Sequence, residues 1–149
     1  MPVLPKRDAF VMKNLFRPGD TKTFKKTITE ADFARFETGL VHPVCATFSL
    51  AQAVEWASRL FVLEMKDDDE EGIGTLLTIE HKSPAFAGET LTITATVKTL
   101  ERNELICSYE AKVDSRMVAT GETGQKILKK EKLQRILQKP SATDGQSER

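Results

Sequence analysis

Three residues carry side chains suited to proton transfer or nucleophilic attack, namely Thr47, Glu55 and His81, and Gly74 can offer its backbone N–H to a ligand. The His81 imidazole can act as a general base near neutral pH, and a carboxylate such as Glu55 can orient it or activate water itself. The Thr47 hydroxyl can serve as a nucleophile or as a positioning group. Gly74, where a loop enters a strand, lets a ligand approach its backbone N–H. Together these groups could activate a nucleophile and stabilise a negatively charged oxygen.

Each of these residues also has a structural interpretation, and for Gly74 it is a backbone role where a loop enters a strand. Thr47 precedes an apolar run typical of a helix, where its hydroxyl could cap the helix N-terminus. His81 ends a predicted strand, where a carbonyl or a water could satisfy its ring. Glu55 lies inside the most apolar helix of the chain, so it either occupies a narrow solvated stripe or is a functional carboxylate. The residue types alone leave these interpretations open.

Other familiar sites are excluded by their motifs. The chain contains no G-x-S-x-G, H-E-x-x-H, G-x-x-x-x-G-K or G-x-G-x-x-G sequence, and it has only 2 histidines for a metal site. The acidic run 67–71 followed by Gly72 has the start of a calcium loop, but Thr78 stands where such a loop needs a bidentate glutamate. We therefore expect no metal ion and interpret residues 66–72 as a solvated acidic loop.

The helices that must position these groups follow from the apolar pattern. A long helix is predicted over Ser49–Met65, where apolar residues cover most of the circumference, as in a buried helix. Ser49 and Gln52 have the spacing of a capping box at its start. Thr29 is typical of the N-cap of a brief helix that reaches Phe36. A short surface helix is expected over 129–138.

Strands account for most of the remaining chain. Apolar and polar residues alternate with period 2 between short turns, which indicates half-buried strands in antiparallel pairing. The predicted strands are Thr21–Ile28, Thr75–His81, Thr90–Leu100, Leu105–Asp114 and Met117–Leu128. The apolar face of such a sheet has to be covered, and only the 49–65 helix is apolar enough to cover it. The predicted fold class is α+β: a five-stranded antiparallel sheet wrapped around one long central helix, plus short helices, which is the hotdog fold.

The organisation and charge of the 149-residue chain limit its partners. We expect a loose lead-in over 1–15, the hotdog domain over 16–138 and a disordered tail over 139–149. The 22 basic and 22 acidic residues give a net charge of zero, which argues against nucleic acid or a membrane surface as partner. Without a signal peptide or an apolar span, and with Cys45 and Cys107 typical of buried, reduced thiols, a cytoplasmic protein is expected.

The length of the predicted helix indicates how a site could be assembled. If residues 47–55 are helical, Thr47 and Glu55 lie about 12 Å apart at 1.5 Å per residue. A hydrogen bond between their side chains within one chain is therefore not expected. One protomer would also leave its helix and a sheet edge uncovered, which favours a homodimer or a larger assembly such as a tetramer. We predict a composite site at the dimer interface, with His81 or the second protomer connecting the groups.

The order and spacing of Thr47, Glu55, Gly74 and His81 resemble those of hotdog-fold thioesterases of the fluoroacetyl-CoA thioesterase-like group. The similarity covers about residues 16–128 and includes RPGDTKTFKKTITEADF, HPVCATFSLAQAVEWAS and GIGTLLTIEHKSPAFAGETLTITATV. It implies an acyl-CoA thioesterase acting on a small or medium acyl thioester. By this resemblance Thr47, Glu55 and His81 are catalytic, Gly74 binds substrate, and no cofactor is needed beyond the CoA of the substrate itself.

The chain departs from that family pattern at several places. Phe48 follows Thr47 where proline is common, no gating phenylalanine is evident between Glu37 and Pro43, and residues 121–125 contain neither histidine nor arginine. The resemblance therefore does not extend to selectivity for a fluorinated acyl group. A hotdog hydratase of the MaoC-like type is one alternative, since TITEADFARF resembles part of that family. A non-catalytic module that binds acyl-CoA or another small ligand is a second.

Overall fold

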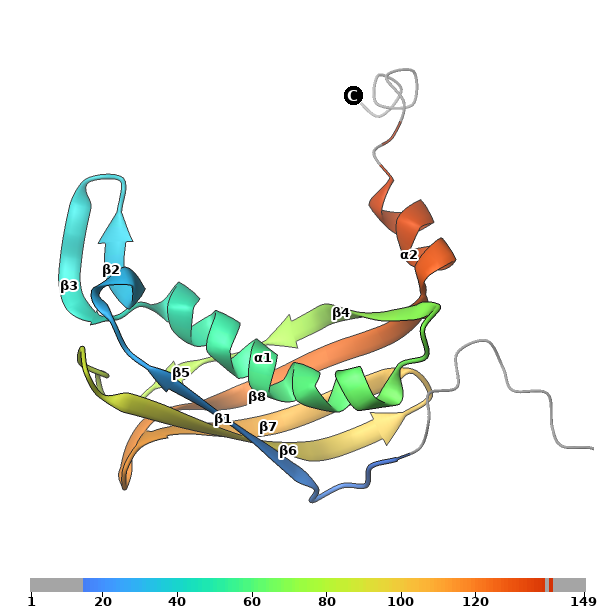
Figure 1. Ribbon diagram of the computed structural model, residues 1–149, viewed down its shortest axis with the longest axis horizontal. Helices are drawn as coiled ribbons and strands as arrows, with labels where there is room; N and C mark the ends of the chain where they lie inside the picture. The colour runs from blue at the N-terminus through green and yellow to red at the C-terminus, as the bar shows by residue number, and fades with distance from the viewer. Residues whose placement is uncertain (1–14, 139, 141–149) are drawn as a thin grey trace, which may run out of the picture.

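The computed structural model describes residues 15–138 and residue 140. Nearly all of the predicted lead-in and tail lies outside these described residues. In chain order the elements are β1 (Thr21–Thr27), the 3-10 turn η1 (Glu30–Asp32), β2 (Phe33–Phe36), β3 (Gly39–Cys45), α1 (Thr47–Met65), β4 (Glu70–Leu77), β5 (Glu80–His81), β6 (Thr90–Glu101), β7 (Glu104–Val113), β8 (Arg116–Lys129) and α2 (Lys130–Leu137). Helix α1 lies across one face of a curved sheet, between the β2–β3 hairpin and α2 (Figure 1).

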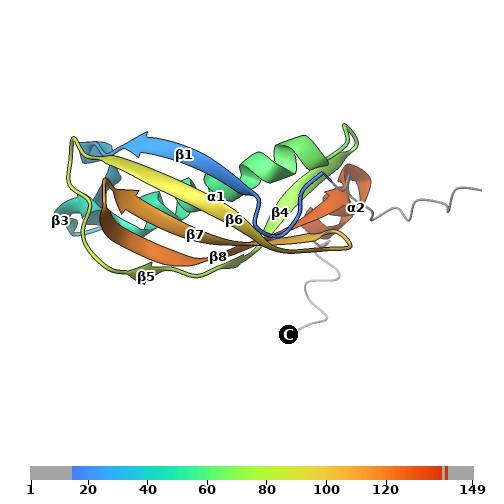
Figure 2. The same cartoon turned by 90° about the horizontal axis from the view of Figure 1, so that it is seen from below.

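The main sheet is antiparallel and has the order β1-β6-β7-β8-β4, with β5 also paired to β8. Figure 2 shows this sheet from the side opposite α1. The predicted antiparallel sheet is confirmed, but it has six strands instead of five, because the predicted strand Thr75–His81 is split into two. Strand β4 already begins at Glu70, and residues 78–79 separate it from β5. Glu70 is buried opposite Lys129 and is therefore not part of a solvated loop. Pairing with β8 overrides the loop character that the acidic residues suggest.

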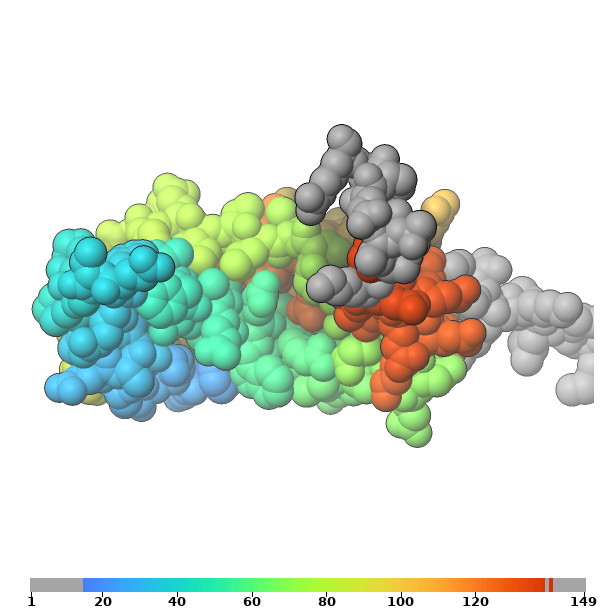
Figure 3. Space-filling view, turned by 90° about the horizontal axis from the view of Figure 1, so that it is seen from above, coloured from blue at the N-terminus to red at the C-terminus, as the bar shows by residue number. Residues whose placement is uncertain are grey.

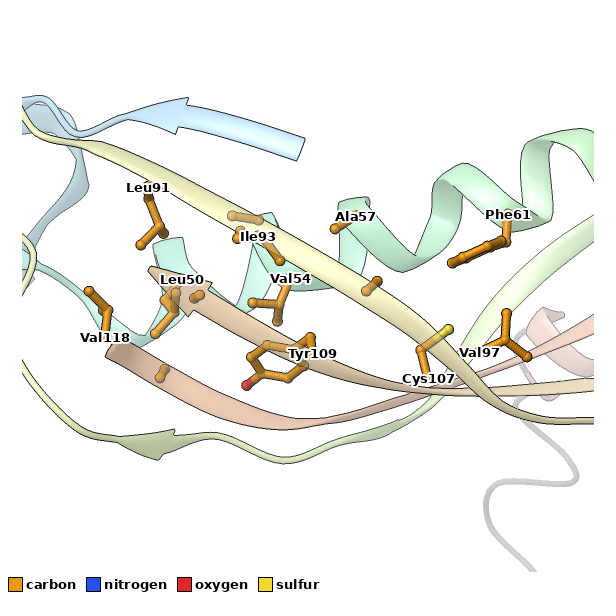
Figure 4. Close-up of a cluster of buried hydrophobic side chains, with 14 of the residues drawn as sticks. Leu50, Val54, Ala57, Phe61, Leu91, Ile93, Val97, Cys107, Tyr109 and Val118 are labelled. Carbon is orange, nitrogen blue, oxygen red and sulfur yellow. The ribbon is translucent and has the colours of Figure 1, made fainter. Parts of the chain in front are cut away.

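The core lies between α1 and the sheet. Leu50, Val54, Ala57 and Phe61 recur at helical spacing and point toward the sheet (Figure 4). The strands present alternate residues to this helix, as predicted: Leu91, Ile93, Ala95 and Val97 from β6 and Leu105, Cys107, Tyr109, Ala111 and Val113 from β7. Burying one large side chain of this kind contributes about 1.5–3 kcal/mol, so this interface holds α1 on the sheet.

Only one face of α1 is buried in the single chain, in agreement with the expectation that one protomer leaves part of this apolar helix uncovered. Phe48, Trp56 and Leu63 are 53%, 41% and 42% exposed. Figure 3 shows the outer side of α1 at the surface between β1 and β4. The sheet covers one side of the helix only, so these outer apolar residues stay at the surface of the single chain. Within the described residues, neither α1 nor α2 is long and apolar enough to span a bilayer.

The segment before α1 differs from the prediction. The brief helix is a single 3-10 turn, and Phe33–Phe36 form a strand that pairs with β3. A helix this short would leave most of its backbone groups unbonded, whereas a hairpin pairs them. The predicted capping box of Ser49 is also wrong, because α1 begins two residues earlier and its N-cap is Ala46. The Ala46 N–H donates instead to the Asp32 backbone oxygen at 2.7 Å.

Asp32 connects η1 with the segments around it. Its carboxylate accepts the Thr29 backbone N–H at 2.9 Å and pairs with Lys26 Nζ at 3.1 Å. Burial acts to raise the pKa of this carboxyl, but the Thr29 N–H and Lys26 together outweigh burial and hold the pKa below its ordinary value of 3.8. The folded state therefore stabilises the ionised form of Asp32.

Replacing Asp32 with asparagine is expected to lower the free energy of unfolding by about 1–2 kcal/mol at neutral pH, because the charged acceptor is lost. With a lowered folded-state pKa, the stabilisation is complete above the unfolded-state pKa and disappears as the pH falls through the folded-state pKa. The difference between wild type and Asp32→Asn should therefore shrink on acidification below pH 3.8. Urea unfolding at a series of pH values measures this, with the exposed Asp68→Asn as control. An Asp32→Asn deficit that is independent of pH would contradict the assignment.

Candidate active site

Thr47 and His81 lie together at one end of α1. Thr47 is the first residue of the helix, and a hydrogen bond of 3.0 Å joins its Oγ1 to His81 Nε2. Both side chains line a pocket of about 360 Å³ that also includes Leu50 and Val118. The Thr47 hydroxyl thus contacts the imidazole instead of capping the helix. When Nε2 is unprotonated, the hydroxyl donates to it, which is the geometry of a nucleophile and its base.

The register of β5 directs His81 toward α1. His81 is opposite Ala119 of β8, and Ala119 is buried on the side of the sheet that faces the helix. Residues directly opposite in an antiparallel pair point to the same face. Just before β5, the Thr78 carbonyl accepts a hydrogen bond from Tyr109 Oη at 2.7 Å and lies where a Cβ at Gly121 would collide with it. This close approach holds the connection from β4 to β5 against the sheet.

Glu55, which lies further along α1, and Gly74 of β4 form a second group. Gly72 and Gly74 are opposite Ile127 and Gln125 of β8, on the helix side of the sheet. Because neither glycine has a side chain, a pocket of about 230 Å³ opens between α1 and β4, with Glu55 in its wall. A Cβ at Gly74 would lie 3.5 Å from Glu55 Oε1, so the carboxylate sits close to this backbone.

Arg59 borders the same pocket and forms an ion pair of 2.7 Å with Glu71. Burial acts to raise the pKa of Glu71, but the Arg59 guanidinium and the Gly72 N–H hold this pKa below its ordinary value. Glu71 therefore stays ionised and neutralises Arg59, while Glu55 contributes a separate acidic group to the pocket.

The structure thus joins the four predicted residues as two pairs and does not bring the pairs together. Thr47 with His81 and Glu55 with Gly74 line different pockets of one chain. Glu55 is exposed in this single chain, as the solvated-stripe interpretation predicts. The absence of a Thr47–Glu55 contact agrees with the helical spacing of these two residues.

Sequence reasoning missed two features of the site. Gln125 is 6% exposed, lines the Glu55 pocket and has an Nε2 without a hydrogen-bond partner. The sequence signal that could have identified Gln125 was its place among the inward-facing residues of a strand with alternating pattern. Phe36 and Phe48 form an edge-to-face pair, with ring centroids 6.5 Å apart, beside Thr47. No sequence signal links these two rings, because Phe36 belongs to a hairpin that the pattern does not predict.

Solved structures with the same architecture define the class of fold. A thioesterase superfamily member from Thermus thermophilus is 29% identical, with a TM-score of 0.79 over 83% of this chain and 92% of that one. The fluoroacetyl-CoA thioesterase FlK is 20% identical, with a TM-score of 0.77 over 84% of this chain and 98% of that one. A hot-dog-like protein from Thermanaerovibrio acidaminovorans is 19% identical, with a TM-score of 0.75 over 83% and 91% of the two chains. The predicted hotdog fold is confirmed, and its class is that of the hotdog thioesterases.

The sequence model of a protein family makes the assignment more specific. Residues 28–131 match the family described as fluoroacetyl-CoA-specific thioesterase. The chain belongs to this family, and it is an acyl-CoA thioesterase. No curated protein sequence matches the chain significantly.

Proposed function

We propose that this chain hydrolyses the thioester of a small or medium acyl-CoA at a site assembled from two protomers. The observation that carries the proposal is the 3.0 Å hydrogen bond between Thr47 Oγ1 and His81 Nε2 at the wall of a pocket. An alcohol that is hydrogen-bonded to an imidazole is suited to attack a carbonyl carbon, because the imidazole can take its proton. Membership of a thioesterase family supports CoA thioesters as the substrate class.

In this mechanism His81 Nε2 takes a proton from the Thr47 hydroxyl or from a water molecule. The resulting oxygen nucleophile attacks the thioester carbonyl carbon, and the carbonyl oxygen becomes negatively charged. The Gly74 N–H of the second protomer donates to this oxygen as the charge develops. The C–S bond then breaks, and the CoA thiolate takes the proton from the His81 imidazolium. If Thr47 is the nucleophile, a water molecule hydrolyses the acyl-threonine by the same steps.

Glu55 enters this scheme from the second protomer, where it orients the imidazole or activates the water. Within one chain Glu55 lines a different pocket from His81. Two features support a homodimer. Strand β4 is an edge of the main sheet, and Trp56, Leu76 and Leu77 expose 41%, 39% and 37% of their surface along this side of the chain. Edge strands and apolar patches of this kind favour association with a second copy.

The compartment is a further part of the proposal. Among the described residues both Cys45 and Cys107 are free, and burial raises the pKa of their thiols to about 11 and about 12. Unreactive free thiols suit a reducing compartment. Because of these free thiols, we propose that the enzyme is cytoplasmic.

The decisive assay follows free thiol released from a panel of saturated acyl-CoA esters, from acetyl to octanoyl. Wild-type protein is expected to release CoA from at least one of the shorter members. In parallel, sedimentation should give twice the chain mass of 16.6 kDa or a multiple of that value. Absence of thiol release across the panel would overturn the proposal. Loss of enoyl-CoA absorbance without thiol release would instead indicate a hydratase.

A further inference from the structure

Two buried hydroxyl groups join α1 to β8 inside the core. Ser58 of α1 is 0% exposed and Thr123 of β8 is 1% exposed. Thr123 Oγ1 donates to Ser58 Oγ at 2.6 Å, and Ser58 Oγ donates in turn to the Val54 backbone oxygen at 3.2 Å. A hydrogen bond in apolar surroundings is stronger than one in water, because the local dielectric constant is low. This bond is therefore a firm link between the helix and the sheet.

The other contacts between α1 and the sheet are less directional or more exposed. The buried side chains of α1 in Figure 4 are apolar, and attraction between such groups has no preferred direction. A hydrogen bond, by contrast, restricts both a distance and an angle. Two partly exposed ion pairs also join α1 to strands: Arg59 with Glu71 of β4, and Glu64 with Lys22 of β1. Exposed pairs hold a geometry only weakly. The buried hydroxyl pair is thus the most restrictive contact on movement of α1 along the sheet.

Each pair of the candidate site joins α1 to a strand that is aligned by β8. Thr47 of α1 contacts His81, whose strand β5 pairs with β8. Glu55 of α1 lies beside Gly74, whose strand β4 also pairs with β8. A shift of α1 along β8 would therefore separate the members of both pairs at once.

The hydroxyl pair lies near the site along both elements. On α1, Ser58 is three residues after Glu55, which is about 4.5 Å along the helix axis. On β8, Thr123 lies between the residue opposite His81 and the residue opposite Gly74. The hydrogen bond therefore connects α1 to β8 within the stretch that carries both pairs.

We infer that Ser58 and Thr123 are positioning residues of the thioesterase: their hydrogen bond fixes the position of α1 along β8 and thereby aligns both pairs of the candidate site. This inference rests on the proposed function, since the alignment matters only for a reaction at these pairs. Alignment of this kind has a large effect on rate, because a displacement of about 1 Å can cost about 10²-fold. A bond that served stability alone could be replaced by apolar groups of the same shape without loss of activity.

The test removes the Thr123 hydroxyl with little change of shape, by Thr123→Val. Ser58 Oγ still donates to the Val54 oxygen, so no buried donor is left unpaired. Tm is therefore expected within about 2 °C of wild type. With the best acyl-CoA of the panel, kcat should fall about tenfold while KM stays within about twofold, because the groups that bind substrate are unchanged and only their alignment is lost.

Thr123→Ser makes the opposite change, since it keeps the hydroxyl and removes a buried methyl group. Its kcat should stay within about twofold of wild type, whereas Tm should fall by about 3–5 °C. Thr120→Val is the matched control. Thr120 is three residues before Thr123 and points to the other face of β8, away from α1. Both kcat and Tm of Thr120→Val should equal the wild-type values.

The outcomes separate a positioning role from a structural one. A lower Tm with unchanged kcat in Thr123→Val would assign the bond to stability and overturn the inference, as would equal losses of kcat in Thr123→Val and Thr123→Ser. If wild type released no thiol from any ester, the proposed function would fail instead. Relaxation dispersion of the backbone amides of Thr47–Met65 would then test the position of α1 by itself. Exchange on the μs–ms timescale of helix register shifts is expected in Thr123→Val and not in wild type or Thr123→Ser; its absence from Thr123→Val would show that the bond does not hold α1 in place.

Discussion

A hybrid dimer with Glu55→Gln in one protomer and His81→Ala in the other is expected to keep about half of the wild-type kcat, although each homodimeric variant loses about 10²–10⁴-fold. The reason is the separation of the two pairs along α1. Thr47 and His81 line one pocket of the chain, and Glu55 and Gly74 line another. If a site takes one pair from each protomer, the hybrid contains one intact site and one site with both lesions.

Co-expression of two differently tagged chains and sequential purification isolates this hybrid for assay. A second hybrid, of wild type with the Glu55→Gln/His81→Ala double variant, is the mirror control. It should be inactive if the pairs act across the interface, because each of its sites carries one lesion. The opposite result, an inactive first hybrid and a half-active second one, would show that both pairs act within one chain.

Gly121→Ala is expected to cost about 2–3 kcal/mol of stability and to lower Tm by about 5–10 °C. A Cβ at Gly121 would collide with the backbone carbonyl of Thr78 and would lie 2.7 Å from Tyr109 Oη. Thr78 is also held by the Glu122 N–H, which donates to its Oγ1 at 2.8 Å. The methyl group therefore displaces the connection between β4 and β5, and with it His81. Activity should fall even at temperatures where the variant is folded.

Gly74→Ala is the matched control for the stability of Gly121→Ala. Both are glycine-to-alanine changes on the helix side of the sheet, but a Cβ at Gly74 makes only an ordinary contact, 3.5 Å from Glu55 Oε1. Its Tm should stay within about 2 °C of wild type, since no backbone atom has to move. Differential scanning calorimetry measures both variants. Equal losses of Tm in the two variants would show that the Thr78 contact is not the cause.

The strands after α1 were predictable because their signal is local. In β6 and β7 the buried, inward positions are apolar and the turn between the two strands is short, so alternation alone locates these strands. The β2–β3 hairpin and the first residues of β4 were not predictable from local pattern. Phe33–Phe36 look helical, and Glu70 and Glu71 look like a loop, until β3 and β8 supply their backbone partners. Long-range pairing decided these segments against their local preference.

The candidate site was predictable by residue type but not by arrangement. Thr47, Glu55, Gly74 and His81 stand out in the sequence, and helical spacing alone separates Thr47 from Glu55. The contact of Thr47 with His81 depends on the register of β5 against β8, in which His81 is opposite Ala119. The apolar pattern of a strand helps to set its register, but β5 has only 2 residues, which is too short a pattern to fix its register against β8.

The two glycines of β4 have a consequence for how this enzyme could change over evolutionary time. The space beside Glu55 comes from side chains that are missing at Gly72 and Gly74, just before the register of β4 against β8 shifts between Gly74 and Leu76. At Gly72 a methyl group would meet Val62 Cγ1 at 2.8 Å, so this position resists enlargement. At Gly74 the same addition meets no such obstacle. A single substitution at Gly74 can therefore reduce the capacity of the cavity, while the sheet that supports it is left intact.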